Sequence, residues 1–297
     1  MKAGFSSMFF GDMRAPDLLA LLGTSQAGRW FDFWFDTPCY LLEGEPARHD
    51  IVSMVRRQLE WRGMGIVTHA AAFDVNPIAY SPAMQRHTLA ETQASLEFAS
   101  DAGANLVTLH GGFSSFASRV SSYDVMLLDK FCDELLDFVE RRKLDITLCL
   151  ENDAATEVMA RPLESLHIME AVLEKHPRLC VTIDVSHVLK TSTMARAMLA
   201  RDSRLDASAL PGFLKKFGSR VRILHFSSPN RYRAHGRIDL NKDAQFIKVF
   251  QEICRHMNVA AVPCIFEYAI EEFGSPTEAI NAIIEDATAL SEKIGNE

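Results

Sequence analysis

Paired cysteines are missing from this chain. Its six cysteines stand singly along 297 residues, and no CxxC or other paired spacing occurs. A disulfide framework or a structural thiolate zinc site would need such pairs. The cysteines therefore indicate reduced thiols inside a core.

Long apolar runs are also missing. Charged residues interrupt every stretch that approaches the roughly 20 residues needed to cross a bilayer. The first residues, 1–10, lack the basic region, apolar core and cleavage site of a signal peptide. We therefore expect a cytoplasmic protein that does not span a membrane.

Positive charge is in deficit as well, because the net charge is −8. A protein with net negative charge is repelled by the phosphates of nucleic acid. A local basic groove can still occur on a protein whose net charge is negative. Nucleic acid is therefore a disfavoured partner that charge alone does not exclude.

The chain does contain a regular alternation of short β-rich runs with longer amphipathic runs, which is typical of parallel strands joined by crossover helices. The expected strands are 3–8, 30–35, 65–69, 106–110, 146–151, 180–184, 221–226 and 262–268. The clearest helical patterns are 47–62, 82–102, 123–142, 162–175, 244–257 and 276–293. Residues 189–217 contain charged clusters and a Pro-Gly, which indicate an extra loop or lid beside one helix.

Eight such units fit either an open doubly wound sheet or a closed barrel. No GxGxxG follows the first strand and no phosphate-binding loop occurs, which weakens the nucleotide-binding, open version. No low-complexity segment, long linker or charge block marks a domain boundary. We therefore predict an α/β fold with one (β/α)₈ TIM barrel of eight parallel strands over residues 1–297.

Potential metal ligands recur at the ends of six expected strands. They are His69, His110, Glu151, Asp184, His225 and Glu267. In a barrel these ends converge on one face, so residues about 40 positions apart become neighbours. A single His or Glu at such a place is commonly an ordinary hydrogen-bonding residue, but repeated carboxylates after apolar strands are costly unless paired or coordinated. The repetition therefore predicts a metal site.

Carboxylate and imidazole ligands together suit Mn²⁺, Zn²⁺, Co²⁺, Fe²⁺ or Mg²⁺. His187 comes three residues after Asp184, so it is expected in the same pocket as a ligand or substrate contact, with a helix-capping or loop histidine as the alternative.

The loop after the seventh expected strand brings further polar residues to the same rim, namely Arg231, Arg233, His235 and Asp239. An arginine there can bind a substrate hydroxyl, carboxylate or phosphate through its fork of donors. For Arg233 and Arg237 the favoured interpretation is a solvated basic loop.

These motifs resemble the xylose isomerase-like barrel superfamily, which includes endonuclease IV, ketose epimerases, hydroxypyruvate isomerase and inosose dehydratase. The resemblance follows the strand order along nearly the whole chain. It is carried by THAAAFDVNP, TLHGG, LEN, TIDVSH, LHFSSPNR, HGRID and FEY.

Resemblance to the ketose epimerases implies a single metal bound by Glu151, Asp184, His225 and Glu267. The two glutamates would exchange a carbon-bound proton. Three accessory positions also match that pattern, namely Glu157, His187 and Arg231, and the last two would contact substrate oxygens.

Resemblance to endonuclease IV implies a cluster of three zinc ions. The matching residues are His69, His110, Glu151, Asp184, His187, His225, His235 and Glu267. That family has an Asp where this chain has Arg233, and a cation there repels the third metal. The loops that would enter DNA are apolar and acidic in this chain, which removes phosphate contacts.

The leading hypothesis is thus an enzyme: a metal-dependent isomerase or epimerase of a sugar or sugar phosphate, working by proton transfer through an enediolate, with one or two divalent ions per chain. In this hypothesis the residues that contact the carbohydrate substrate are His69, His110, Glu157, His187, Arg231 and His235. The alternative is a zinc-dependent apurinic/apyrimidinic-site phosphodiesterase, and a third class is a metal- or sugar-binding protein without catalysis. Homo-oligomerisation stays open.

Overall fold

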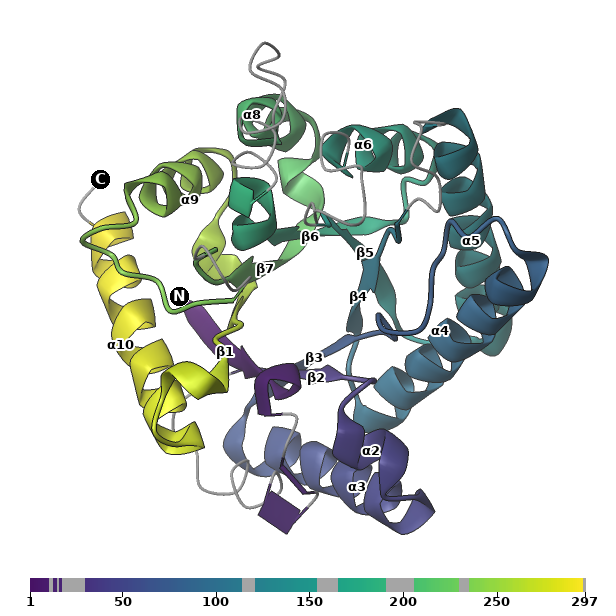
Figure 1. The fold of residues 1–297 in the computed structure, drawn as a ribbon, viewed down its shortest axis with the longest axis horizontal. Helices are drawn as coiled ribbons and strands as arrows, with labels where there is room; N and C mark the ends of the chain where they lie inside the picture. Colours follow the sequence, from purple (N-terminus) through teal and green to yellow (C-terminus); the bar gives the residue numbers. More distant parts are fainter. Residues whose placement is uncertain are drawn as a thin grey trace.

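The strands of this protein close into a barrel (Figure 1). The computed structural model describes residues 1–10, 13–14, 16–17, 30–113, 121–153, 165–190, 206–229 and 235–295. The strands are β1 (Lys2–Ser6), β2 (Trp30–Trp34), β3 (Gly65–His69), β4 (Leu106–His110), β5 (Thr147–Glu151), β6 (Cys180–Asp184), β7 (Val221–Phe226) and β8 (Pro263–Phe266). Each is parallel to the next, and β8 pairs with β1. The predicted (β/α)₈ barrel is confirmed.

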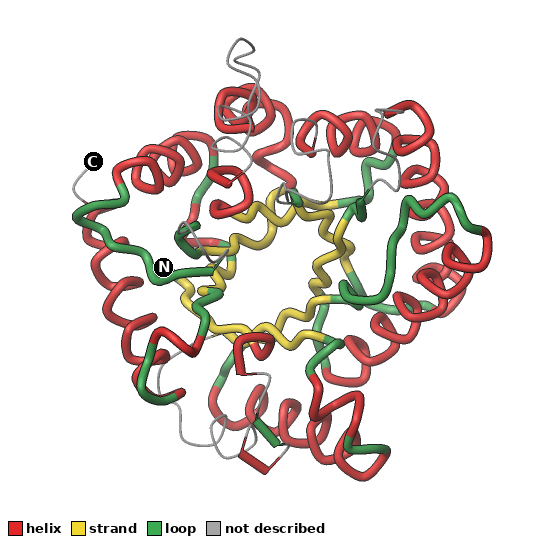
Figure 2. Tube along the Cα trace, viewed as in Figure 1, coloured by secondary structure: helices red, strands yellow, loops and turns green. Residues whose placement is uncertain are grey.

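Helices surround the ring of strands (Figure 2). The described α-helices are α2 (Pro38–Leu42), α3 (Glu45–Arg62), α4 (Pro82–Ala102), α5 (Ser121–Arg142), α6 (Ser165–Lys175), α8 (Asp206–Phe217), α9 (Ala244–His256) and α10 (Pro276–Gly295). Short 3-10 helices are η1 (Ser7–Phe10), η3 (Gly218–Arg220), η4 (Val259–Ala261) and η5 (Ile270–Glu272). Among the described helices, none combines the length and the apolar character that crossing a bilayer requires.

Most boundaries agree with the sequence expectation to within a few residues. The first strand is shorter than 3–8 because the chain turns into η1 after Ser6. The eighth is shorter than 262–268, since β8 ends at Phe266 and Glu267 is the first residue beyond it. Within the expected loop or lid, residues 191–205 lie outside the described residues, and α8 begins at Asp206.

Helix α9 shows how the outer layer is held. Its buried residues, Phe246, Val249, Phe250 and Ile253, are three or four positions apart and so lie on one helix face. Phe226 of β7 meets two of these rings at centroid distances of 5.8 and 5.5 Å. Aromatic contact between strand and helix therefore stabilises this side of the barrel.

Side chains alternate between the two faces of each strand, and the expected ligands lie on the face that lines the barrel lumen. A separate apolar cluster contains Val67, Cys149, Cys180, Ile223 and Ile265. Four of these residues come two positions before His69, Glu151, His225 and Glu267. Residues two apart in a strand share a face, so the polar residues form the next layer, toward the C-terminal ends. All six cysteines are free, and five are buried, as expected.

The turn after β4 depends on a glycine. Gly112 has φ +82°, and a Cβ there would lie 2.5 Å from Asn76 Oδ1 and 2.8 Å from Pro77 Cδ. Asn76 also binds the Phe113 backbone, accepting from its N–H at 3.1 Å and donating to its carbonyl at 2.8 Å. A larger residue at Gly112 would therefore push this turn away from the barrel mouth.

The ring contacts on α9 predict the effect of one truncation. Phe250 is 2% exposed, so Phe250→Ala should lower the free energy of unfolding by about 3–5 kcal/mol through lost burial and a cavity. Urea denaturation followed by circular dichroism measures this change. Met126 is 52% exposed, and Met126→Ala should change the free energy by no more than about 0.5 kcal/mol. Equal effects of the two substitutions would contradict this account of the core.

Candidate metal centre

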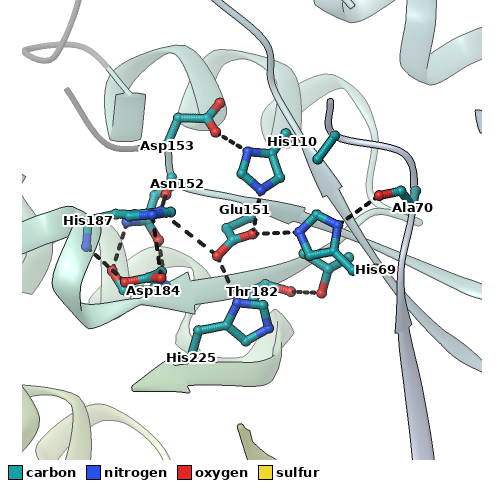
Figure 3. A network of polar contacts seen from close by, with 12 residues as sticks. His69, Ala70, His110, Glu151, Asn152, Asp153, Thr182, Asp184, His187 and His225 are labelled. Carbon is teal, nitrogen blue, oxygen red and sulfur yellow. Dashed lines mark hydrogen bonds and ion pairs between the residues drawn. The ribbon is translucent and has the colours of Figure 1, made fainter. Parts of the chain in front are cut away.

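The C-terminal mouth of the barrel holds a dense cluster of histidines and carboxylates (Figure 3). Eight of the residues expected there from the sequence come together: His69, His110, Glu151, Asp184, His187, His225, His235 and Glu267. Glu157 and Arg231, also expected there, lie outside the described residues, as does Arg233.

Glu151, at the end of β5, is the centre of this cluster. Its Oε2 lies 3.2 Å from Nε2 of His69 and 3.2 Å from Nε2 of His110. Its Oε1 lies 2.9 Å from Nδ1 of His225, with Nδ1 of His187 at 3.9 Å. One buried carboxylate therefore joins histidines from β3, β4 and β7.

Glu267 contacts the same nitrogen of His225 as Glu151 does. Its backbone N–H donates to the carbonyl of Phe226 at 3.0 Å, which continues the β7–β8 pairing by one residue. Oε1 of Glu267 lies 3.3 Å from Nδ1 of His225, and Oε2 lies 3.4 Å from Nδ1 of His235. The His235 carbonyl accepts a bond from Ala269 N–H at 2.8 Å, which keeps this loop residue beside β8.

Asp184 is held by its neighbour strand through Asn152. The Asn152 side chain donates to the Asp184 carbonyl and accepts from the Asp184 N–H, both at 2.9 Å. His187 N–H donates to Asp184 Oδ1 at 2.8 Å, and His187 Nδ1 donates to the Asn152 carbonyl at 2.9 Å. This arrangement leaves Nε2 of His187 at 3.6 Å from Asp184 Oδ2, so His187 lies beside the cluster.

The loop beyond His235 points its charged residues elsewhere. Arg237 is not simply solvated, because its Nε and Nη2 donate to the two Asp286 oxygens of α10, each at 3.0 Å. Tyr268 donates to Asp286 at 2.9 Å, which anchors the residue after Glu267. Asp239 pairs with Lys242 at 2.9 Å and takes no part in the cluster.

Three further residues at the cluster were not singled out from the sequence. Trp34 of β2 stacks on His69 with ring centroids 3.6 Å apart and an angle of 18°. Asp153 accepts a short hydrogen bond from Nδ1 of His110. Asp32 is fully buried two positions before Trp34. Strand alternation in WFDFWFD was the available signal that Asp32 and Trp34 share the inner face.

The histidines have opposite protonation tendencies. Burial lowers the pKa of His69 to about 4, against the weaker opposing effect of Glu151. Burial also opposes charge on His225, but the carboxylates of Glu267 and Glu151 outweigh it and raise the pKa of His225 to about 10. Burial similarly lowers the pKa of His235 to about 4.

The two glutamates also diverge. Burial disfavours the charge on Glu151, yet His225 and His110 outweigh it and hold the pKa of Glu151 well below its usual range. Burial raises the pKa of Glu267 well above its usual range, and the carboxylates of Asp184 and Glu151 add to this effect. In the metal-free protein, one carboxylate is therefore ionised and the other holds a proton.

The donor atoms fit a divalent cation. Three overlapping groups of candidate ligand atoms together contain the four expected metal ligands: Glu151 with Asp184 and His187, Asp184 with His235 and Glu267, and Glu267 with Asp32 and His225. Inside each group the ligand atoms lie within 4.8 Å of one another. Asp184 Oδ2 and Glu267 Oε1 are buried acceptors without a hydrogen-bond partner among the described residues. Buried acceptors of this kind are costly unless a donor or a cation satisfies them.

A second group contains His69, His110 and Glu151. The Ala70 carbonyl can only accept, so the contact of 2.8 Å places a proton on Nδ1 of His69. In neutral His69 the Nε2 lone pair therefore faces Glu151 Oε2, another acceptor. A cation at this point would satisfy both acceptors.

Comparison with known proteins identifies the family. The model of the xylose isomerase-like TIM barrel family matches residues 26–292. The chain belongs to this family, as its motifs suggested. No curated protein matches the chain in sequence.

Solved structures with the same fold include several named as epimerases. A D-tagatose 3-epimerase-like protein has 16% identity and a TM-score of 0.75, with 100% of this chain and 99% of that chain covered. An L-ribulose 3-epimerase has 13% identity and a TM-score of 0.65, covering 99% and 95%. A 3-keto-D-glucoside 4-epimerase from E. coli has 12% identity and a TM-score of 0.62, covering 96% and 98%. At these identities the likeness shows the fold.

The environments of His225 and His69 predict that these two residues titrate at widely different pH values in the metal-free protein. At about pH 7, His225 should be protonated and His69 neutral, because their pKa values are about 10 and about 4. The ring nitrogens of ¹⁵N-histidine-labelled protein report this directly, with His225→Gln and His69→Gln providing the assignments. Titration of both residues near 6.5, the ordinary pKa of histidine, would contradict the described environments.

These shifts also set the direction of stability changes. His69 has a folded pKa below its unfolded value, so its contribution is present above pH 6.5 and is lost as pH falls toward about 4. His225 has a raised folded pKa, so its contribution is present below pH 6.5 and is lost as pH rises toward about 10.

Proposed function

We propose that this protein is a metal-dependent isomerase or epimerase that moves a proton on a carbon beside the carbonyl group of a sugar or sugar phosphate. The observation that carries the proposal is the pair of buried glutamates, Glu151 and Glu267, which contact one nitrogen of His225 at 2.9 and 3.3 Å. Their pKa values are shifted in opposite directions. A pair of this kind suits one proton acceptor and one proton donor.

The proton transfer follows from those two environments. Glu151 is ionised, so its carboxylate can accept the proton as the substrate C–H bond breaks and an enediolate forms. Glu267 holds a proton that can form the new C–H bond. The reaction then leaves Glu151 protonated and Glu267 ionised, and the reverse transfer or exchange with solvent resets the pair. Burial of both side chains keeps bulk water away while the C–H bond breaks and re-forms, and exchange with solvent takes place between turnovers.

Glu151, Asp184, His225 and Glu267 would hold the metal ion. When bound, a divalent ion there supplies a Lewis acid that favours negative charge on the substrate oxygens. His187 and His235 lie beside these ligands and can donate to or accept from sugar hydroxyls. His69 and His110 are either further substrate contacts or ligands of a second ion.

The comparisons support a carbohydrate substrate. The family is the xylose isomerase-like TIM barrel family, and the similar structures include proteins named for epimerisation of tagatose, ribulose and a keto-glucoside. Their names share chemistry at a carbon of a sugar, which agrees with a cluster built around two proton-exchanging carboxylates.

The second candidate is a zinc-dependent phosphodiesterase that acts at apurinic or apyrimidinic sites. The observation that favours it is the group formed by His69, His110 and Glu151, which supplies three ligand atoms for an additional ion. Two ions can activate water and neutralise a leaving oxygen. The acidic net charge of −8 opposes a duplex substrate.

Conservative changes at the glutamates test the leading proposal. Glu151→Gln and Glu267→Gln should each lower kcat by about 10²–10⁴-fold, because each removes one proton-transfer group. The measurement is deuterium incorporation from D₂O into a panel of ketoses and ketose phosphates, with the metal content of each variant determined alongside. Glu134→Gln on the exposed surface of α5 provides the matched control and should retain full exchange.

Intact exchange in both glutamate variants, with metal bound, would rule out the assigned roles. Cleavage of an abasic duplex by protein with three zinc ions, without exchange on any sugar, would favour the phosphodiesterase. Tight sugar binding by wild-type protein with neither activity would point to a binding protein.

Metal binding should release protons. The pKa of His225 is raised to about 10 in the metal-free protein, so this imidazole must lose a proton before it can act as a ligand. Affinity for Mn²⁺ should therefore rise by up to about tenfold per pH unit between about pH 6 and 8. Calorimetry in buffers of different ionisation enthalpy counts the released protons. An affinity that does not change with pH would contradict this linkage.

A further inference from the structure

One buried carboxylate in the lumen has no part in the proton transfer described above. Asp32 lies in the middle of β2 and is 0% exposed. It shares the inner face of that strand with Trp34, whose ring stacks on His69. Asp32 therefore points into the barrel, one layer below the mouth.

A carboxylate in this position needs a partner. Neither Asp32 oxygen has a well-aligned hydrogen-bond donor among the described residues, although the side chains of Trp34 and Ser6 lie close enough to favour its charged form slightly. Burial raises the pKa of Asp32 to about 7, and the strongest opposing influence is His225. Isolated buried carboxylates are costly, so the neighbouring imidazole is the natural partner.

The geometry around His225 agrees with this pairing. One oxygen of Asp32, one ring nitrogen of His225 and one oxygen of Glu267 lie within 4.8 Å of one another. Nδ1 of His225 is directed at Glu151 and Glu267, as Figure 3 shows for Glu151. Nε2 of His225 is buried without a hydrogen-bond partner in the described part of the chain. The neighbouring side chains of Asp32 and His225 therefore each carry a buried polar atom without a well-aligned hydrogen-bond partner among the described residues.

We propose that Asp32 is a positioning residue for His225: it accepts a hydrogen bond from Nε2–H, and so keeps the Nδ1 lone pair directed at the cluster of Glu151 and Glu267. A histidine that binds an ion through one nitrogen carries its proton on the other, and a carboxylate behind it fixes both the tautomer and the ring orientation. This inference rests on the proposed metal site. It assigns Asp32 no contact with substrate.

The same cluster contains a parallel that supports this role. Asp153 accepts a short hydrogen bond from Nδ1 of His110, and this leaves Nε2 of His110 directed at Glu151. Asp153 acts from the rim, where its side chain is 27% exposed, and Asp32 acts from the closed interior. Two histidines that contact Glu151 would then each donate a hydrogen bond to a further carboxylate: His110 to Asp153, and His225 to Asp32.

Two substitutions weaken or remove the hydrogen-bond acceptor that Asp32 offers to His225. Asp32→Asn keeps the shape and a weaker acceptor, and should weaken Mn²⁺ binding by about 10-fold; Asp32→Leu removes the acceptor and should weaken it by about 100-fold. Competition with a chelator measures each affinity. Asp124→Asn is the matched control, because Asp124 is also fully buried but accepts from Tyr80 at 3.2 Å, outside the cluster. Its Mn²⁺ affinity should equal that of the wild-type protein.

Thermal unfolding of the same metal-free variants separates positioning from a merely structural role. Asp32→Leu leaves Nε2–H of His225 buried without an acceptor, so the metal-free midpoint should fall, and the stabilisation by added Mn²⁺ should also become smaller. A lowered metal-free midpoint together with wild-type Mn²⁺ affinity would overturn the proposal.

A measurement on the wild-type protein does not depend on whether the variants fold. In Zn²⁺-loaded, ¹⁵N-histidine-labelled protein, Nε2 of His225 should carry a proton that exchanges slowly with water, and Nδ1 should carry none. A proton on Nδ1, or an unprotonated Nε2, would overturn the proposal. Failure of the wild-type protein to bind Zn²⁺ or Mn²⁺ at all would instead refute the metal site itself, so the two failures are distinguishable.

Discussion

Closure of the sheet is the constraint on which the rest of this structure depends. When β8 pairs with β1, the inner faces of eight strands share one narrow lumen, and side chains from distant parts of the chain must fill it together. Apolar residues fill most of the lower layer, which also contains Asp32. Carboxylates and imidazoles fill the upper one, where burial makes every unpaired charge costly.

That crowding explains the electrostatics of the site. Glu151, Asp184, Glu267 and Asp32 are all buried within one cluster, so their negative charges repel one another. Protons on His225 and Glu267 reduce the repulsion in the metal-free protein. A divalent cation would also reduce this repulsion and would displace the proton from His225, so the affinity for the metal would depend on pH.

Much of this arrangement could be predicted from the sequence. The strand-end positions of His69, Glu151 and Asp184 were evident because short apolar runs ended at them, and barrel closure then required them to meet. Asp32 and Asp153 were not predicted. Asp32 lies inside an aromatic strand rather than at its end, and the role of Asp153 depends on the rotation of one imidazole, which strand pattern does not determine. The extra helix α2 also had no periodic signal, because it is only five residues long.

Asn152 bears on which ion the proposed metal site would accept. Its amide binds both the N–H and the carbonyl of Asp184, so the backbone after β5 and the end of β6 are joined at a fixed spacing. Glu151 and Asp184 therefore cannot move apart independently. A site whose width is set by backbone hydrogen bonds discriminates among cations by radius, because ligands that cannot spread favour an ion that fits the existing gap.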